Sequence, residues 1–248
     1  MRLFRPTLPL AASLLLACAG AFAVTQDEVA AGAAKLYRGR IAQLARASML
    51  DLDRAFLARV ERIVLRLDAQ ARRDHPEAPV RWEIHTSSDA DDNASCMAGG
   101  KLLLSQAYAE QLALTDAELA MVISHEMQHA ILRHNLKEYQ EAERLDPRWL
   151  SRPFAELEEA VDQDTRLMGK LAGLNKEQEI EADREGLAMA WRAGWAAREL
   201  ANYFRKVERN AATGDRGSAS HPSPGQRWRA ARSQAERLPH RPREGEGL

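Results

Sequence analysis

Residues 115–131 read Thr-Asp-Ala-Glu-Leu-Ala-Met-Val-Ile-Ser-His-Glu-Met-Gln-His-Ala-Ile, and this stretch decides how the chain folds. Thr115 and Glu118 form a capping box, which begins a helix because each side chain satisfies a backbone N–H of the first turn. Apolar residues flank the two histidines of the stretch on both sides, and we expect the helix to run past His134. The histidine pair is therefore predicted to lie on a helix that packs into the core.

His125 and His129 stand four residues apart, so a helix places both imidazoles on one face, about one turn from each other. Both rings can then reach one metal ion, and Glu126 lies at the rim of that face, where it can contact a metal-bound water. The alternative is that these side chains lie on a solvent-exposed helix surface without a function. The apolar residues beside them indicate burial, however, and buried imidazoles need hydrogen-bond or metal partners. The HExxH pattern is typical of zinc peptidases and predicts one zinc ion per chain, with Glu126 as the catalytic base.

A hydrolytic zinc site needs three protein ligands and one open position for water. In the HExxHxxGxxH pattern the third ligand is a histidine, but here that position is Asn135 and Leu132 replaces the glycine. Residues 179–183, Glu-Ile-Glu-Ala-Asp, instead place Glu179 and Asp183 on one helical face. We expect Glu179 to bind zinc and Asp183 to accept a hydrogen bond from the far nitrogen of a ligand histidine. A solvated acidic face is the alternative interpretation of this run.

Helical patterns cover most of the rest of the chain. Residues 26–73 carry apolar side chains at helical spacing, and residues 133–173 read as a charged helical excursion between two core helices. Asn175 and Gln178 form a cap signal that predicts a helix start, and Gly194 is expected to end that helix. The stripes predicted to be buried are Phe56, Val60, Ile63, Val64 and Leu67 in the first segment, and Ile180, Leu187 and Trp191 in the last.

Two short strands are predicted between these helices. Residues 80–86 alternate apolar and polar side chains, and residues 101–105 follow Gly99-Gly100. If the second strand is an edge strand beside the cleft, a substrate can add to it through backbone hydrogen bonds, which tolerates many sequences. Unfolded polypeptides are the substrates that suit this geometry.

The segments HEMQHAILRH (125–134) and EIEADREG (179–186) together resemble the gluzincin family of zinc metallopeptidases, which includes the CAAX prenyl endopeptidases, the heat-shock membrane protease HtpX and periplasmic quality-control peptidases. The resemblance implies a predominantly helical α+β, zincin-like fold with a small β-sheet beside the active-site helix. It also implies an endopeptidase of a soluble periplasmic branch, because the membrane helices and helical repeats of other branches are absent from the sequence.

Further motifs extend the resemblance from about residue 80 to residue 238. Asn93-Ala94 and Gly99-Gly100-Lys101 resemble elements around an edge strand over the active site, although Ser95 and Ala98 depart from the usual residues. Ser220-His221-Pro222 through Arg227 resembles a later His-Pro and Arg element. The substrate-binding residues that the resemblance implies are Asn93, Ala94, Gly100 and Lys101. His221 and Arg227 are its candidates for oxyanion stabilisation, and His221 could alternatively cap the open zinc position.

The N-terminus has the pattern of a secretory signal peptide. Arg2 and Arg5 precede an uncharged apolar run, residues 8–23, that ends in Ala-Phe-Ala. Cleavage after Ala23 would release the chain into the periplasm, whereas lipidation at Cys18 would tether it to a membrane of the bacterial envelope. An uncleaved anchor is a third alternative. We therefore divide the chain into a signal peptide (1–23), an N-terminal helical segment packed on the catalytic domain (24–75), a zinc metallopeptidase domain (76–238) and a disordered tail (239–248).

Composition limits the possible partners. The chain has 35 Lys and Arg against 36 Asp and Glu, so no excess of positive charge points to nucleic acid. The expected function is hydrolysis of peptide bonds in unfolded or misfolded proteins of the envelope by a zinc-activated water. The alternatives are a zinc-stabilised chaperone or binding protein without catalysis, and an amidase with the same metal chemistry. Retention of Glu126 argues against the first, because a purely structural zinc has no use for a base.

Overall fold

The computed structural model describes residues 24–78, 80–211, 217–218 and 220–240 of the chain. The helices are α1 (Gln26–Arg46), α2 (Arg54–Asp74), α3 (Gln106–Gln111), α4 (Asp116–Ile131), α5 (His134–Leu145), the 3-10 helix η1 (Pro147–Ser151), α6 (Phe154–Gln163), α7 (Thr165–Arg192), α8 (Ala197–Asn210) and α9 (Pro224–Arg237). The strands are β1 (Glu83–Ser87), β2 (Ala94–Met97) and β3 (Lys101–Ser105). This arrangement confirms the predicted α+β class. The predicted signal peptide with Cys18, and residues 241–248 of the predicted tail, lie outside the described residues.

The three strands form one sheet in the order β1-β3-β2, with β1 parallel and β2 antiparallel to β3. The predicted strand over residues 101–105 is confirmed as β3, but the condition that it is an edge strand is not met, because β3 is central and β2 is the edge beside α4. β3 is central because β1 pairs with one of its edges, while the turn at Gly99 and Gly100, with φ angles of 77° and 80°, folds β2 back onto the other. A Cβ at Gly100 would also lie 2.5 Å from Val80, so only glycine fits this turn.

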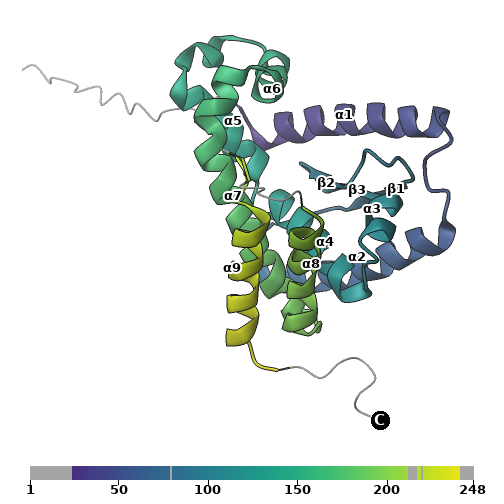
Figure 1. The fold of residues 1–248 in the computed structure, drawn as a ribbon. Helices are drawn as coiled ribbons and strands as arrows, with labels where there is room; N and C mark the ends of the chain where they lie inside the picture. Colours follow the sequence, from purple (N-terminus) through teal and green to yellow (C-terminus); the bar gives the residue numbers. More distant parts are fainter. Residues whose placement is uncertain (1–23, 79, 212–216, 219, 241–248) are drawn as a thin grey trace, which may run out of the picture.

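The sheet lies between α1 on one face and α2 and α4 on the other (Figure 1). Alternation along β3 explains this packing, because Leu103 faces Tyr37 and Leu44 of α1 whereas Leu102 and Leu104 join the main core. The Tyr37 hydroxyl also donates a hydrogen bond of 2.6 Å to the carbonyl of Leu102. Helix α1 is thereby fixed to the sheet that borders the cleft.

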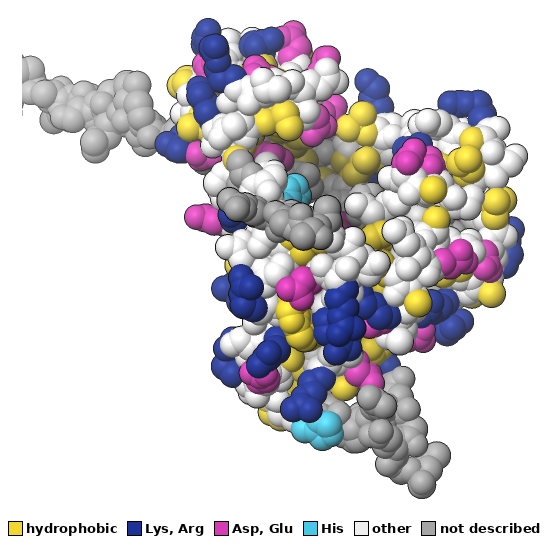
Figure 2. Space-filling model, in the orientation of Figure 1, with side chains coloured by type: hydrophobic (Ala, Val, Ile, Leu, Met, Phe, Trp, Pro, Cys, Tyr) yellow, Lys and Arg dark blue, Asp and Glu magenta, His cyan; other side chains and the backbone are white. Residues whose placement is uncertain are grey.

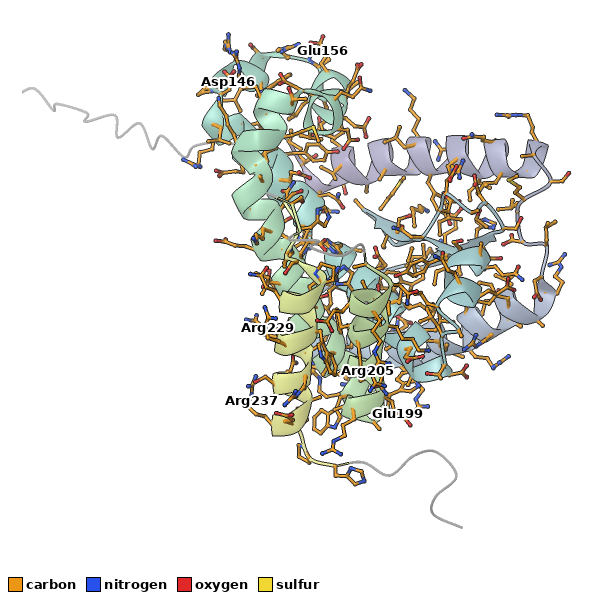
Figure 3. The ribbon with its side chains drawn as sticks, in the orientation of Figure 1. Asp146, Glu156, Glu199, Arg205, Arg229 and Arg237 are labelled. Atoms are coloured by element: carbon orange, nitrogen blue, oxygen red, sulfur yellow. The ribbon has the colours of Figure 1, made fainter. Side chains whose placement is uncertain are left out.

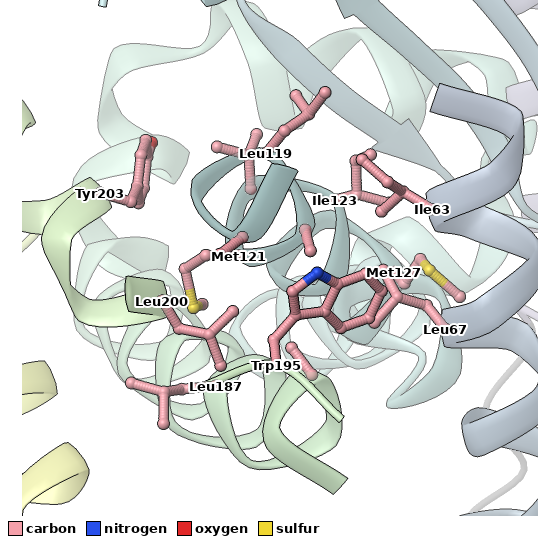
Figure 4. Close-up of a cluster of buried hydrophobic side chains, with 14 of the residues drawn as sticks. Ile63, Leu67, Leu119, Met121, Ile123, Met127, Leu187, Trp195, Leu200 and Tyr203 are labelled. Carbon is pink, nitrogen blue, oxygen red and sulfur yellow. The ribbon is translucent and has the colours of Figure 1, made fainter. Parts of the chain in front are cut away.

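Helix α4 runs through the centre of the core and is surrounded by α2, α7 and α8 (Figure 4). The stripe predicted in the first helical segment is buried as expected, from Phe56 at 8% exposure to Val60 and Leu67 at 0%. Each large apolar side chain buried here contributes about 1.5–3 kcal/mol. Backbone positions along α4 are therefore held from several sides, including those that carry its two histidines.

Helix α4 ends earlier than predicted, and the expectation that it runs past His134 is wrong. Its last residue is Ile131, and Arg133 adopts the left-handed conformation with φ 55° before α5 begins at His134. This conformation costs an L-residue about 1–2 kcal/mol. The packing of α5 on α7 compensates, since the carbonyl of His134 accepts a hydrogen bond of 3.1 Å from Gln178. The chain reverses direction at a point where the sequence shows no glycine.

Helix α7 is longer than predicted. It begins at Thr165, where Asp164 caps the backbone N–H groups of the first turn, so the predicted start at Asn175 is wrong. Asn175 instead donates a hydrogen bond of 2.7 Å to Glu138 of α5. Ile180 is 49% exposed, and its predicted burial is also wrong, because it lines a groove between α7 and α9. Gly194, with φ 112°, follows the end of the helix as expected.

Residues 133–173 form the predicted helical excursion, which comprises α5, η1, α6 and the first turns of α7. Tyr139, Leu157 and Leu171 of the excursion belong to an apolar cluster that is separate from the main core and also includes Val29 and Ala33 of α1. Among the described residues, none of the helices combines the length and apolar character needed to cross a membrane.

Candidate metal centre

Helices α4 and α7 bring together the three side chains predicted to hold zinc. His125 Nε2 and His129 Nε2 lie 3.2 Å apart. The Glu179 carboxylate lies 3.3 Å from His129 Nε2 and 3.7 Å from His125 Nε2. All three ligand atoms fall within 4.8 Å of one another. The two helical segments thus meet at the point that the sequence indicated.

The donor set and its spacing fit a zinc ion. Zinc–nitrogen and zinc–oxygen bonds of about 2.0–2.1 Å in a tetrahedral arrangement separate neighbouring ligand atoms by about 3.3 Å. The two Nε2 atoms, 3.2 Å apart, lie close to that value, and so do His129 Nε2 and Glu179 Oε1 at 3.3 Å and His125 Nε2 and Glu179 Oε2 at 3.7 Å. Two histidines and one glutamate are also a known set for catalytic zinc, which leaves the fourth position for substrate or water. These residues would hold the metal.

Gly186 explains how α7 approaches α4 closely enough to place Glu179. A Cβ at this position would lie 2.9 Å from the backbone nitrogen of His125 and 3.1 Å from its Cα. Any side chain would therefore push the two helices apart. The sequence alone does not assign Gly186 this role, because a glycine in one helix does not show which other helix it contacts.

Asp183 lies behind His125, where the sequence predicted it. Its Oδ1 is 2.9 Å from His125 Nδ1, although the N–H direction deviates from the ideal line. Arg227 of α9 donates two hydrogen bonds to the same carboxylate, of 2.8 and 2.6 Å. Burial pushes the pKa of Asp183 upward, but the hydrogen bonds with His125 and Arg227 hold it below its ordinary value. The ionised carboxylate can then keep the proton of His125 on Nδ1 and leave Nε2 free for a metal.

Arg227, a predicted candidate for oxyanion stabilisation, is held mainly by Asp183. Its Nε and Nη2 donate to the Asp183 carboxylate, and its Nη1 lies 3.9 Å from Glu179 Oε2. The guanidinium also lies 5.3 Å above the ring of Phe204. Arg227 lines the cleft, but these contacts first of all orient the Asp183 carboxylate.

His134 also belongs to the centre, although no pattern in the sequence predicts this. Its Nδ1 lies 3.1 Å from His129 Nδ1, and its Nε2 lies 3.2 Å from Glu181 Oε2. Burial, followed by repulsion from His129, lowers the pKa of His134 to about 4, so the ring is neutral near pH 7. A neutral ring that donates from Nε2 to Glu181 can accept the Nδ1 proton of His129, which leaves His129 Nε2 free for the metal.

Glu126, the predicted base, lies at the edge of the centre. Its Oε1 is 4.0 Å from His125 Nε2. Burial raises the pKa of Glu126, and the neighbouring carboxylate of Glu179 acts in the same direction, against His125 and His129. A carboxylate with a raised pKa is a better proton acceptor, as a general base requires.

A cleft of about 400 Å³ opens over the centre, and the space-filling view shows a histidine side chain in a hollow of the surface (Figure 2). Asn93 and Ala94, two of the predicted substrate-binding residues, line it at the start of β2. His221 also lines the cleft as an exposed residue, and its Nδ1 lies 3.0 Å from the Ser220 hydroxyl. Gly100 and Lys101 are not among the lining residues that the structure describes, since β3 is central. The Lys101 amine pairs instead with Glu83 of β1.

Comparison with known families supports the chemistry of this centre. The family model of peptidase family M48 matches residues 56–235, from α2 to α9. The matched range contains the three candidate ligands, Glu126, Asp183, His221 and Arg227. No curated protein matches the chain.

Proposed function

The chain belongs to peptidase family M48 and is a metalloprotease, and from this premise we propose that it is an exported, zinc-dependent endopeptidase that cleaves unfolded polypeptides in the bacterial envelope. Peptidases of this family are zinc-dependent. The observation that carries the proposal is the convergence of His125, His129 and Glu179 beside Glu126 in an open cleft.

The chemistry divides between the metal and the protein. Bound zinc would polarise the scissile carbonyl and lower the pKa of a water molecule to about 7. Glu126 is placed to act as the base: its carboxylate would accept a proton from the attacking water and would return it to the leaving amine when the C–N bond breaks. Asp183 and His134 keep the two imidazoles in the required tautomers.

Strand β2 provides a place for the substrate backbone. One edge of β2 pairs with β3, and the other edge has no strand partner among the described residues. Residues 93–96, which include most of β2, line the cleft together with Glu126. An extended peptide can add to this edge through backbone hydrogen bonds, which favours unfolded segments of many sequences.

Export rests on the N-terminal pattern. Arg2 and Arg5 followed by the apolar run of residues 8–23 support secretion to the periplasm with removal of the signal segment. Lipidation at Cys18 is the alternative, and it would hold the enzyme at a membrane surface. Unfolded polypeptides in the same compartment would be the substrates, which makes protein quality control the proposed role.

The test compares wild type with Glu126→Gln for bound zinc and for degradation of an unfolded protein. We expect both proteins to hold one zinc ion, with proteolysis reduced by about 10²–10⁴-fold in the variant because the base is lost. Equal proteolysis in both proteins would contradict the mechanism. Zinc binding with no proteolysis in either would favour a non-catalytic protein, unless His221→Ala restores cleavage, as expected if His221 holds the enzyme latent.

A further inference from the structure

Two tyrosines on the wall of the cleft are not used by the mechanism above. Tyr108 of α3 and Tyr203 of α8 both line the cleft together with Glu126. Their hydroxyl oxygens lie 2.9 Å apart, and either oxygen can be the donor of the hydrogen bond that joins them. The pair connects two helices, but its place in the cleft also exposes it to a bound substrate.

The number of protons in this pair points to a third partner. Each phenol hydroxyl carries one proton, so two hydroxyls have two protons, and their mutual hydrogen bond uses one of them. The second proton is not used, because neither hydroxyl makes another hydrogen bond with the described residues. Burial raises the pKa of both tyrosines, which therefore keep their protons near neutral pH and act as donors.

Leaving the second hydroxyl proton of the tyrosine pair without an acceptor costs free energy, unless a molecule in the cleft accepts the hydrogen bond. Tyr203 is 8% exposed, and a buried polar group without a hydrogen bond costs about 1–3 kcal/mol. Water would accept the bond in the free enzyme. A peptide that enters the cleft displaces such water and brings carbonyl oxygens, which are the acceptors that a phenol hydroxyl suits.

Contacts of both residues limit their movement. The backbone N–H of Tyr108 donates to the capping hydroxyl of Ser105 at 3.1 Å, in the first turn of α3. The Tyr203 ring packs edge-on against Phe204, with 5.1 Å between the ring centres. Tyr203 lies on α8 at the edge of the buried cluster around α4 (Figure 4). Preorganised donors of this kind stabilise charge that develops on a substrate oxygen, because they need no rearrangement during the reaction.

We propose that the Tyr108–Tyr203 pair donates one hydrogen bond to a carbonyl oxygen of the peptide bound in the cleft, and that both tyrosines are therefore substrate-contacting residues of the peptidase. One hydroxyl contacts the substrate, and the other donates to the first and strengthens its bond. The inference rests on the proposed function, since it assigns these residues to the same reaction.

The experiment uses the full zinc-loaded protein and the variants Tyr108→Phe, Tyr203→Phe and the double variant, which keep the aromatic rings. Tyr139→Phe is the control, because Tyr139 is equally buried but lies in the excursion against Phe154. Bound zinc, thermal unfolding, kcat and KM on a fluorogenic peptide, and the Kd of a peptide hydroxamate are measured for each protein.

We expect every protein to keep its zinc and the worse single variant to lose roughly tenfold in kcat/KM, as for one hydrogen bond. The double variant should be no worse than that single variant, because the pair delivers one proton to the substrate. A loss in kcat with KM unchanged places the bond on the oxyanion, whereas a rise in KM places it on a neighbouring carbonyl. Either result supports the proposal.

Values of kcat/KM within twofold of wild type in both single variants would overturn the proposal, and so would independent losses that multiply in the double variant. If wild type cleaves no peptide, the proposed function fails, and the hydroxamate then decides the inference. A roughly tenfold weaker Kd in the worse single variant supports the contact. An unchanged Kd overturns it.

Discussion

Charged side chains are dense in two regions of this protein, but they are organised differently. In the outer part of the excursion, residues 141–164, ion pairs join near neighbours in the sequence, such as Arg148 with Asp146 and Arg152 with Glu156. Figure 3 shows Asp146 and Glu156 at the outer end of the molecule. In the metal centre, Asp183 and Glu179 of α7 meet partners from α4 and α9.

Cavity size does not show which of the two regions is the functional site. A cavity of about 620 Å³ lies in the outer excursion, whereas the cleft over the metal centre measures about 400 Å³. Both acidic and basic side chains line the larger cavity, and the Arg152 side chain is 47% exposed there. In the centre, burial and several partners act on each group, with Asp183 at 13% exposure. Convergence of buried groups from different helices is therefore the better sign of a functional site.

The largest expected effect is on metal binding. Glu179→Gln should weaken zinc binding by more than a hundredfold, because one of three protein ligands is lost from a site worth about 10–16 kcal/mol when complete. Glu156→Gln removes a carboxylate from the excursion and should leave zinc affinity unchanged. Competition with a chromophoric chelator measures both. Equal zinc affinity in the two variants would remove the distinction between the regions.

A smaller loss is expected for His134→Phe, which keeps the ring volume but removes the acceptor for His129 Nδ1. Loss of such a partner lowers metal affinity by about 10–100-fold. Lys137→Met is the matched control, because Lys137 lies 3.8 Å from the same Glu181 carboxylate without contacting His134 or the ligands in the contacts described. The same chelator assay measures both variants. Wild-type zinc affinity in the His134→Phe protein would contradict the role of His134, and only α4, α7 and α9 would then contribute to the centre.

Two glycines of α7 allow the metal centre and the excursion to be compared within one helix. Gly186→Ala should destabilise the fold by about 1–3 kcal/mol, because its Cβ would meet the backbone of α4. Gly173→Ala should stabilise the fold by about 0.5–1 kcal/mol, since nothing lies within 4 Å and alanine favours a helix. Urea unfolding of the zinc-free proteins gives both values. Shifts of the same sign would contradict the close contact between α4 and α7.

The smallest effect is expected in the excursion. Arg152→Ala breaks an ion pair whose side chains are 47% and 48% exposed. Exposed pairs of this spacing contribute about 0.3–0.5 kcal/mol, so the free energy of unfolding and the peptidase activity should both stay close to wild type. A loss of activity beyond tenfold, measured with the same fluorogenic peptide, would show that the excursion takes part in substrate binding.

The parts that the sequence predicted well depend on local patterns. The capping box of Thr115 and Glu118 begins α4 as expected, because its hydrogen bonds lie within one turn. The spacing of His125 and His129 required only a helix to place both rings on one face. Glu179 could be placed beside them because few side-chain types complete a zinc site.

The parts that it could not predict depend on contacts between distant segments. Arg133 breaks the helix before His134 because α5 packs on α7, and nothing in the local sequence signals this turn. The same break turns His134 toward His129. Ile180 continues an apolar pattern, yet the position of α9 leaves it half exposed. β3 is central because β1, which lies earlier in the chain, pairs with the edge of β3 that β2 leaves open.

The central claim is that His125, His129 and Glu179 hold one zinc ion, and X-ray absorption at the zinc edge of the loaded protein tests it most directly. The account predicts two imidazole nitrogens at about 2.0–2.1 Å and a carboxylate oxygen at about 2.0–2.2 Å, with the carboxylate signal lost in Glu179→Gln. A spectrum with an unchanged ligand set in that variant, or with sulfur at about 2.3 Å, would contradict the account.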